Sequence, residues 1–295
     1  MLTCPDFLVI GHITKDLLAD GRFTIGGTVT YSSLTACNLG RETGIVTRAD
    51  AALDLSHFTA CGIALHRLPS PVTTTFENIY LDGTRYQYIR AVAAPIAPAD
   101  VPATWRAAPI VHLGPLAQEL SRDMVDLFDQ ALIGVTPQGW MRCWDGSGLV
   151  RPVPWAEVEE ILARADVLVF SEHDVARDVA TIHRYARLAR IMVVTQGRRG
   201  CTVYVRGQRP RHFPAFPAHE VDPTGAGDVF AAAFLIKLQA TGDPYQAARY
   251  ANCVASFVVE TPGATGLPTP GQVAERMARG HRDGFVGARH SGEVV

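Results

Sequence analysis

The chain has 295 residues, of which 47% are hydrophobic and 19% charged, and its formal net charge is −2. This composition is typical of a globular protein with a large core, and it lacks the basic excess of nucleic-acid-binding proteins. No apolar run reaches the roughly 18 to 20 residues of a membrane span, and the N-terminus lacks the basic start of a signal peptide. Because the six cysteines form no CxxC pair and no zinc spacing, we expect reduced thiols in a cytoplasmic protein without a membrane or nucleic-acid partner.

Short runs rich in Val and Ile alternate along the chain with segments of helical periodicity. Predicted buried strands cover residues 6–11, 108–114, 165–171 and 190–197, and predicted helices cover 121–132, 154–165, 174–189, 229–240 and 244–260. Alternating strands and helices favour a parallel sheet with helices on both faces. The predicted fold class is therefore α/β.

Two stretches depart from this alternation. Residues 17–27 and 73–93 alternate polar with apolar or β-branched side chains around Asp-Gly turns, which predicts hairpins with one wet face. They are expected to form a small β-flap on the α/β body, or, as an alternative, edge strands of the main sheet. The last residues, from about 281, have no apolar periodicity and are interpreted as a loose tail.

The stretch HEVDPTGAGDVFAAAFLIKL, residues 219–238, places Asp228 directly after a Gly-Ala-Gly turn and before an apolar helical run. It is not a P-loop, because the chain has no G-x-x-x-x-G-K-[ST]. It does not fit a dinucleotide fingerprint either, since Phe230 stands at the third glycine and Asp228 would repel a pyrophosphate. Both familiar nucleotide loops are therefore disfavoured.

A helix that begins near Gly225 presents unpaired backbone N–H groups at its positive dipole end, which is a ready anion site. The amides of Gly225, Ala226 and Gly227 are therefore candidates to close around a phosphate during its transfer. Asp228, in the same turn, is placed to accept a proton from a hydroxyl that attacks this phosphate. On the helix start alone, an ordinary first-turn carboxylate is the alternative interpretation.

The string DPTGAGDVFAAAF resembles the signature of the ribokinase-like (PfkB) carbohydrate kinases. Other segments also resemble this family, and the resemblance extends from about residue 6 to 270. The resemblance implies a three-layer α/β/α sandwich with a mostly parallel central sheet and a small β-sheet lid. It implies one kinase domain over residues 1–280, with the lid at about 12–30 and 73–93 and a tail at 281–295.

By this resemblance Asp228 is the catalytic base, and the amides of Gly225, Ala226 and Gly227 form the anion hole. Residues matching the family's substrate segments are Asp16, the Gly26–Gly27 turn and Tyr31, and the last stands where many sugar kinases have Asn. Residues matching the segments around the nucleotide are Thr195, Gly197, Gly200, Asn252, Ser256 and Gly263.

The family's N-x-x-E motif, which organises magnesium through water, is replaced by SEHD at residues 171–174. Asp174 thus stands for Glu, and a carboxylate that is one methylene shorter can still order a hydrated magnesium ion. Asp222 matches a position that in many members helps to bind a monovalent cation such as K⁺. Arg142, between two tryptophans, is interpreted as a surface cation stacked on an aromatic ring and is left outside the core site.

The resemblance implies a kinase that uses ATP and Mg²⁺ to phosphorylate a hydroxyl of a small polyol, either a sugar or a cyclitol such as myo-inositol. The segments GGTVTYSS and 136–150, with the SEHD variant, are similar to the branch that phosphorylates inositol. Two alternatives stay open: a nucleoside kinase of the same fold, with the flap aromatics Phe76, Tyr80, Tyr86 and Tyr88 holding a base, and a non-catalytic sugar-binding paralogue. Exposed hairpins with an apolar face favour a homodimer through the lid.

Overall fold

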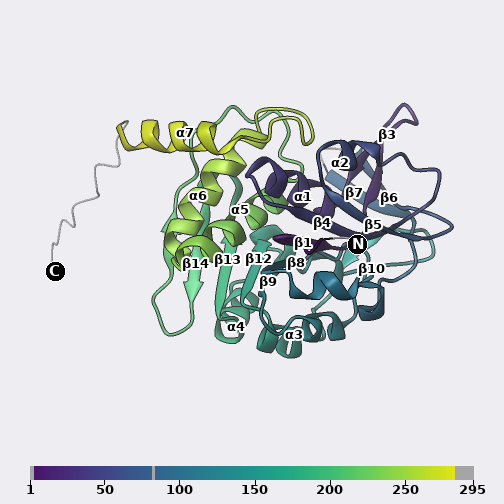
Figure 1. The fold of residues 1–295 in the computed structure, drawn as a ribbon, viewed down its shortest axis with the longest axis horizontal. Helices are drawn as coiled ribbons and strands as arrows, with labels where there is room; N and C mark the ends of the chain where they lie inside the picture. Colours follow the sequence, from purple (N-terminus) through teal and green to yellow (C-terminus); the bar gives the residue numbers. More distant parts are fainter. Residues whose placement is uncertain (1–2, 82–83, 283–295) are drawn as a thin grey trace.

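The computed structural model describes residues 3–81 and 84–282, and within them the chain forms a large central sheet (Figure 1). The strands are, in order across this sheet, β15 (Arg211–Phe213), β14 (Cys201–Val205), β13 (Ile191–Thr195), β12 (Val167–Ser171), β9 (Leu132–Val135), β8 (Ile110–Leu113), β1 (Phe7–Ile10), β4 (Thr43–Ala49) and β5 (Ala64–Pro69). The strands from β13 to β5 pair in parallel, whereas β14 pairs antiparallel with both of its neighbours, β13 and β15. The predicted, mostly parallel sheet is confirmed.

The central strands are apolar on both faces because helices cover both sides. In β1, Phe7 and Val9 pack into one core while Leu8 and Ile10 pack into another, as the period of two in a strand requires. Such two-sided burial produces the continuous apolar runs seen in the sequence.

Two groups of helices form the outer layers (Figure 1). One face of the sheet carries α1 (Thr28–Asn38), α2 (Ser56–Ala60), α5 (Ala226–Thr241), α6 (Pro244–Val258) and α7 (Pro270–Arg282). The other carries α3 (Val158–Arg164), α4 (Val179–Leu188) and the 3₁₀ turns Pro98–Asp100, Ala103–Ala107 and Arg122–Leu127. The expected three-layer α/β/α sandwich is thereby confirmed.

Helix α5 is the central helix of its layer and contacts both α1 and α6. Its residues from 229 to 236 are all buried, which explains why the sequence there is apolar and small rather than amphipathic. The following helix, α6, begins where the Asp243 side chain accepts the N–H groups of Tyr245 and Gln246, with Pro244 in the first turn. These local signals fix the residue at which α6 begins, directly after the end of α5.

A separate small sheet holds the two predicted hairpins. Its strands lie in the order β3 (Phe23–Gly26), β2 (Thr14–Leu17), β6 (Thr74–Leu81) and β7 (Thr84–Ala91). The hairpins therefore form a lid and are not edge strands of the main sheet. A short ribbon of β10 (Arg142–Trp144) and β11 (Val150–Pro152) lies beside it, where Ile89 donates its N–H to the Gly148 carbonyl.

Several predicted boundaries are wrong. Residues 121–132 form only a 3₁₀ turn, Arg122–Leu127, because Leu132 already pairs with the central sheet. The lid stretch 12–30 ends earlier than expected, since Gly27, at φ +92°, ends the hairpin and α1 begins at Thr28. Helix α3 begins four residues later than predicted, and α4 begins five residues later than predicted. The expected tail at 281–295 begins inside α7, and residues 283–295 lie outside the described part of the chain.

Among the described residues, none of the helices is both long enough and apolar enough to cross a membrane. All six cysteines carry free thiols.

Candidate active site

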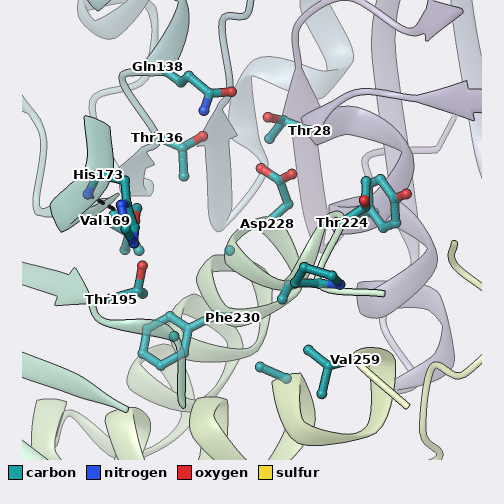
Figure 2. Close-up of a pocket in the computed structure, with 18 of the residues that line it drawn as sticks. Thr28, Thr136, Gln138, Val169, His173, Thr195, Thr224, Asp228, Phe230 and Val259 are labelled. Carbon is teal, nitrogen blue, oxygen red and sulfur yellow. Dashed lines mark hydrogen bonds between the residues drawn. The ribbon is translucent and has the colours of Figure 1, made fainter. Parts of the chain in front are cut away.

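A cleft of about 1030 Å³ opens at the carboxyl ends of the parallel strands, between the lid and the start of α5. Strand ends of this kind are where open α/β sheets place their ligands. Figure 2 shows the Asp228 carboxylate pointing from the start of α5 toward the side where Thr28, Thr136 and Gln138 lie. Predicted site residues that line the cleft are Asp16, Gly27, Tyr31, Asp174, Thr195, Gly197, Gly200, Asp222, Gly225, Ala226, Gly227, Asp228, Asn252 and Ser256.

The start of α5 leaves open amides facing the cleft. Within the described residues, the N–H groups of Gly225, Gly227 and Asp228 have no hydrogen-bond acceptor in the protein, whereas the Ala226 N–H donates to the Pro223 carbonyl at 3.2 Å. Three of the first-turn donors are therefore available to an anion. The Ala226 amide, which was expected to belong to this group, is already used within the turn.

Gly225 is required for two reasons. Its φ of +76° lies in the left-handed region, and a Cβ atom there would lie 2.2 Å from Cδ1 of Tyr31. The Tyr31 ring thus packs directly on the glycine turn. Burial and the charges of three carboxylates (Asp16, Asp222 and Asp228) raise the pKa of the Tyr31 phenol, so the hydroxyl stays protonated beside them.

Asp228 is a carboxylate with a perturbed proton affinity. Its removal from water is the main cause that raises its pKa to about 6, and the nearby negative charge of Asp174 adds to the rise. A hydrogen bond from Thr28 and the positive charge of Arg142 act in the opposite direction. A base whose pKa lies close to neutral suits proton transfer at physiological pH.

The lid side of the cleft is polar. Asp16 lies over Gly26, where a Cβ atom would approach its Oδ2 to 2.1 Å, so only glycine leaves room for this carboxylate, and Gly26 itself is outside the cleft lining. From the lid sheet, Asn78 and Gln87 face the cleft and are joined by a hydrogen bond of 3.2 Å between Gln87 Nε2 and Asn78 Oδ1. Carboxylate and amide groups are suited to hydroxyl-rich ligands.

The opposite end of the cleft has an apolar wall of Ala215, Phe216, Pro217, Ala255 and Val259. Asn252 belongs to this wall, but its Nδ2 donates to the carbonyls of Phe213 and Pro214 at 3.0 and 3.1 Å. Because Asn252 belongs to α6, these hydrogen bonds hold the end of β15 against this helix. Ser256 accepts a hydrogen bond from Arg276.

The expected phosphate segment after β13 lies beside that wall. Thr195 ends the strand, and the turns at Gly197 and Gly200 have φ values of +57° and +95°. A Cβ atom on Gly200 would lie 2.1 Å from the Phe213 carbonyl oxygen, so only glycine allows β15 to approach this turn.

The two predicted cation ligands already have protein partners. Asp174 accepts the Ser171 N–H at 2.8 Å and the Gln138 amide at 3.1 Å. Asp222 accepts the N–H groups of Thr224 and Gly263. Gly263, which was predicted to contact the nucleotide, lies outside the cleft lining. Each carboxylate keeps further lone pairs for a cation.

Within the described residues, no group of three or more His, Cys, Asp or Glu side chains clusters as a metal site. Magnesium that arrives with donor phosphates needs only one or two carboxylates from the protein. The repulsion between Asp174 and Asp228, seen in the raised pKa of Asp228, is the electrostatic situation that a cation relieves.

Several cleft residues were missed from the sequence. Arg142, interpreted as a surface cation, lines the cleft, and its guanidinium lies 5.9 Å from the centre of the Phe76 ring in the lid. Other polar residues of the lining that were missed include Thr28, Asn78, Gln87, Thr136, Gln138 and His173. Thr28 directly follows the Gly-Gly turn and could have been found from that position, whereas the lid amides carry no local signal.

Solved structures share this architecture. A pyrophosphate-dependent kinase in the ribokinase family, complexed with a pyrophosphate analog and myo-inositol, matches with a TM-score of 0.76 at 24% identity, over 92% of this chain and 99% of the other. Ribokinase of Arabidopsis thaliana, complexed with ribose and ATP, matches with a TM-score of 0.71 at 20% identity, over 93% of this chain and 99% of the other. The chain therefore has the ribokinase fold.

Sequence relatives define the family. The model of the pfkB family carbohydrate kinases matches residues 149–270. Inositol 3-kinase of Zea mays is 30% identical over 78% of this chain and 63% of its own length, and that of Oryza sativa is 31% identical over 77% and 61%. Fructokinase of Klebsiella pneumoniae is 27% identical over 80% of this chain and 85% of its own. Residues 149–270 thus match the PfkB family of carbohydrate kinases, and the chain is similar to the inositol 3-kinases, although it spans only about three fifths of their length.

Proposed function

We propose that this protein is a kinase that transfers the γ-phosphoryl group of ATP to a hydroxyl of a small polyol, either a cyclitol such as myo-inositol or a sugar. The observation that carries the proposal is the start of α5. There a carboxylate with a raised pKa follows three open amides, in a cleft with a polar lid side and an apolar far wall. Base and anion site thus lie within one helical turn.

In this mechanism the acceptor hydroxyl lies under the lid, held by Asp16 and the lid amides. Asp228 accepts its proton as the oxygen attacks the γ-phosphorus, the bond from this phosphorus to the β,γ-bridging oxygen breaks, and ADP leaves. The open amides of Gly225, Gly227 and Asp228 stabilise the charge of the transferring group. Asp174 would hold Mg²⁺ through water and Asp222 would hold K⁺; the chemistry that Mg²⁺ supplies is neutralisation of the donor phosphates.

The raised pKa of Asp228 predicts the pH dependence of the reaction. Only the carboxylate form accepts a proton, so kcat/KM should be constant above about pH 7 and fall tenfold per unit below about pH 6. Initial rates at low acceptor concentration from pH 5 to 9 measure this acidic limb, the fall of kcat/KM at low pH. A limb near pH 4, the ordinary range of an aspartate, would contradict the assigned base or its burial.

The lid favours a polyol over a nucleoside. Of the four flap aromatics, only Phe76 lines the cleft among the side chains that the structure describes, and it is joined there by the amides of Asn78 and Gln87. Amide groups match hydroxyls better than the face of a base. Several sequence relatives are inositol 3-kinases, which puts cyclitols first among the substrates to test.

The test is a product-release screen over inositols, ketoses, aldoses and nucleosides, with ATP and pyrophosphate as alternative donors. We expect turnover with ATP and one class of polyol. Turnover with nucleosides alone would support the alternative kinase. If no acceptor gives turnover while a polyol still raises the melting temperature, the protein is a non-catalytic sugar-binding paralogue.

We also infer that the protein acts in the cytoplasm, because all six thiols are free. A homodimer through the lid is consistent with its exposed Leu18, Phe23, Leu81 and Tyr86, and sedimentation velocity measures it. A monomer at micromolar concentration would exclude this assembly.

A further inference from the structure

His112 is a buried histidine in the middle of the central sheet. It lies on β8, is fully inaccessible to solvent, and packs edge-on against Phe7. Its Nε2 lies 3.1 Å from Oγ1 of Thr136. Its Nδ1 has no hydrogen-bond partner among the described residues, and such a buried polar atom is uncommon enough to require an explanation.

His12 differs from His112 in its hydrogen bonds. His12 is also fully buried, but its Nδ1 lies 2.8 Å from Thr74 Oγ1 and its Nε2 lies 2.9 Å from the Ala94 carbonyl oxygen. Both ring nitrogens of His12 therefore have a partner. His112 has only one, and that partner lines the cleft.

Burial determines the protonation of His112. Removal from water lowers its pKa to about 3, so the ring is neutral at physiological pH and carries one N–H. A proton on Nδ1 would leave a buried donor without an acceptor. A proton on Nε2 can be donated to Thr136 and leaves only an unpaired acceptor at Nδ1. The tautomer with the proton on Nε2 is therefore favoured.

This tautomer sets the direction of the next hydrogen bond. Thr136 Oγ1 accepts from His112, so the Thr136 proton must point elsewhere. Within the described residues that hydroxyl donates to no protein acceptor. Thr136 directly follows β9, where its N–H bonds to the Leu113 carbonyl. In Figure 2 its side chain lies between Gln138 and Thr195, on the side of the cleft that Asp228 faces.

We propose that His112 is a positioning residue that makes the Thr136 hydroxyl a hydrogen-bond donor into the cleft, directed at an oxygen of the transferring phosphoryl group. This inference rests on the proposed kinase function. In the proposed reaction the attacking hydroxyl gives its proton to Asp228, so its oxygen and those of the phosphoryl group lie on the Asp228 side of the cleft. A fixed donor contributes most where negative charge shifts during the reaction.

Two matched pairs of variants test the proposal kinetically. His112→Gln keeps a side-chain N–H at the end of a chain of similar length, whereas His112→Met has almost the same shape without a donor. Thr136→Ser keeps the hydroxyl, and Thr136→Val removes it. We expect His112→Met and Thr136→Val each to lower kcat by about ten- to hundredfold with little change in the acceptor KM. The Gln and Ser variants should retain most of the activity.

The double variant distinguishes positioning from general damage to the core. If His112 acts through Thr136, then His112→Met should lower kcat no further once Thr136→Val is present. Independent, multiplying losses, or full activity of His112→Met, would overturn the proposal. Melting temperatures of all variants identify any that fail to fold.

A measurement on the unaltered protein gives a readout that needs no turnover. Two-dimensional ¹H–¹⁵N spectra of the imidazole rings, with His112→Gln to assign the signal, report the tautomer. We expect a neutral ring with the proton on Nε2 down to pH 5. A ring protonated on Nδ1, or one that titrates near pH 6.5, would refute the proposal even if the protein proves not to be a kinase.

Discussion

Replacing Asp228 by Asn is expected to lower kcat by about 10²- to 10⁴-fold, because the amide cannot accept the proton of the attacking hydroxyl. The shape of the side chain is nearly unchanged, and the open amides of Gly225 and Gly227 stay in place. Binding of the acceptor and of ATP should therefore persist. Steady-state rates and calorimetric titrations of both ligands measure the two effects separately.

The same substitution should make the protein more stable at neutral pH. The pKa of Asp228 is raised in the folded state to about 6, so ionisation at pH 7 opposes folding, and this penalty disappears below about pH 4, where the carboxyl group is protonated in both states. Asp228→Asn removes the penalty. Its melting temperature should exceed that of the wild type by a few degrees at pH 7.5 and equal it near pH 4.

Asp54 is the matched control for this stability effect. Its pKa is lowered by hydrogen bonds from Ser56, so its ionised form favours folding, and Asp54→Asn should lower the melting temperature at neutral pH. A kinetic loss in Asp228→Asn without a gain in stability would show that the pKa of this carboxylate is raised less than to about 6. Full activity would remove Asp228 from the role of base.

Replacing Gly225 by Ala is expected to reduce both stability and turnover. The new Cβ atom would lie 2.2 Å from the Tyr31 ring, and the backbone φ of +76° is unfavourable for alanine. Left-handed strain costs about 1 to 2 kcal/mol and overpacking about 1 to 3 kcal/mol. We expect the free energy of unfolding to fall by about 3 kcal/mol. Because the start of α5 must shift, kcat should fall by about 10²-fold.

Gly242, at the other end of α5, is the matched control. Its φ is +66°, but a Cβ atom there would meet nothing within 4 Å. Gly242→Ala should therefore cost only the backbone strain and leave the active site intact. Urea unfolding of both variants gives the difference that belongs to the Tyr31 contact. In a Tyr31→Ala background, Gly225→Ala should lower the free energy of unfolding by less. Equal losses of stability in Gly225→Ala and Gly242→Ala would contradict the packing of Tyr31 on Gly225.

The raised pKa of Asp228 lowers stability at neutral pH at the point where the proposed chemistry occurs, while the rest of α5 is buried among apolar side chains. Sites that bind or transform ligands commonly retain such costs. Gly225, in the same turn, avoids a cost, because glycine adopts a positive φ without strain and leaves room for the Tyr31 ring.

Patterns of neighbouring residues were enough to predict the α/β class, the two lid hairpins and the start of α5 at the Gly-Ala-Gly turn. Each of these depends on local periodicity, turn residues or a helix terminus, which adjacent residues determine. The prediction failed for residues 121–132, where apolar spacing fits a helix. There Leu132 is drawn into the central sheet, and such pairing overrides local preference.

The sequence by itself thus determined the class of fold, the family resemblance and the position of the candidate base. Only the tertiary structure decided that Tyr31 packs on Gly225, that Arg142 and the lid amides face the cleft, that the Asn252 amide is used inside the protein, and that His112 meets Thr136. The partners in these contacts are far apart along the chain. Their proton affinities and hydrogen bonds depend on burial and on neighbours that folding alone brings together.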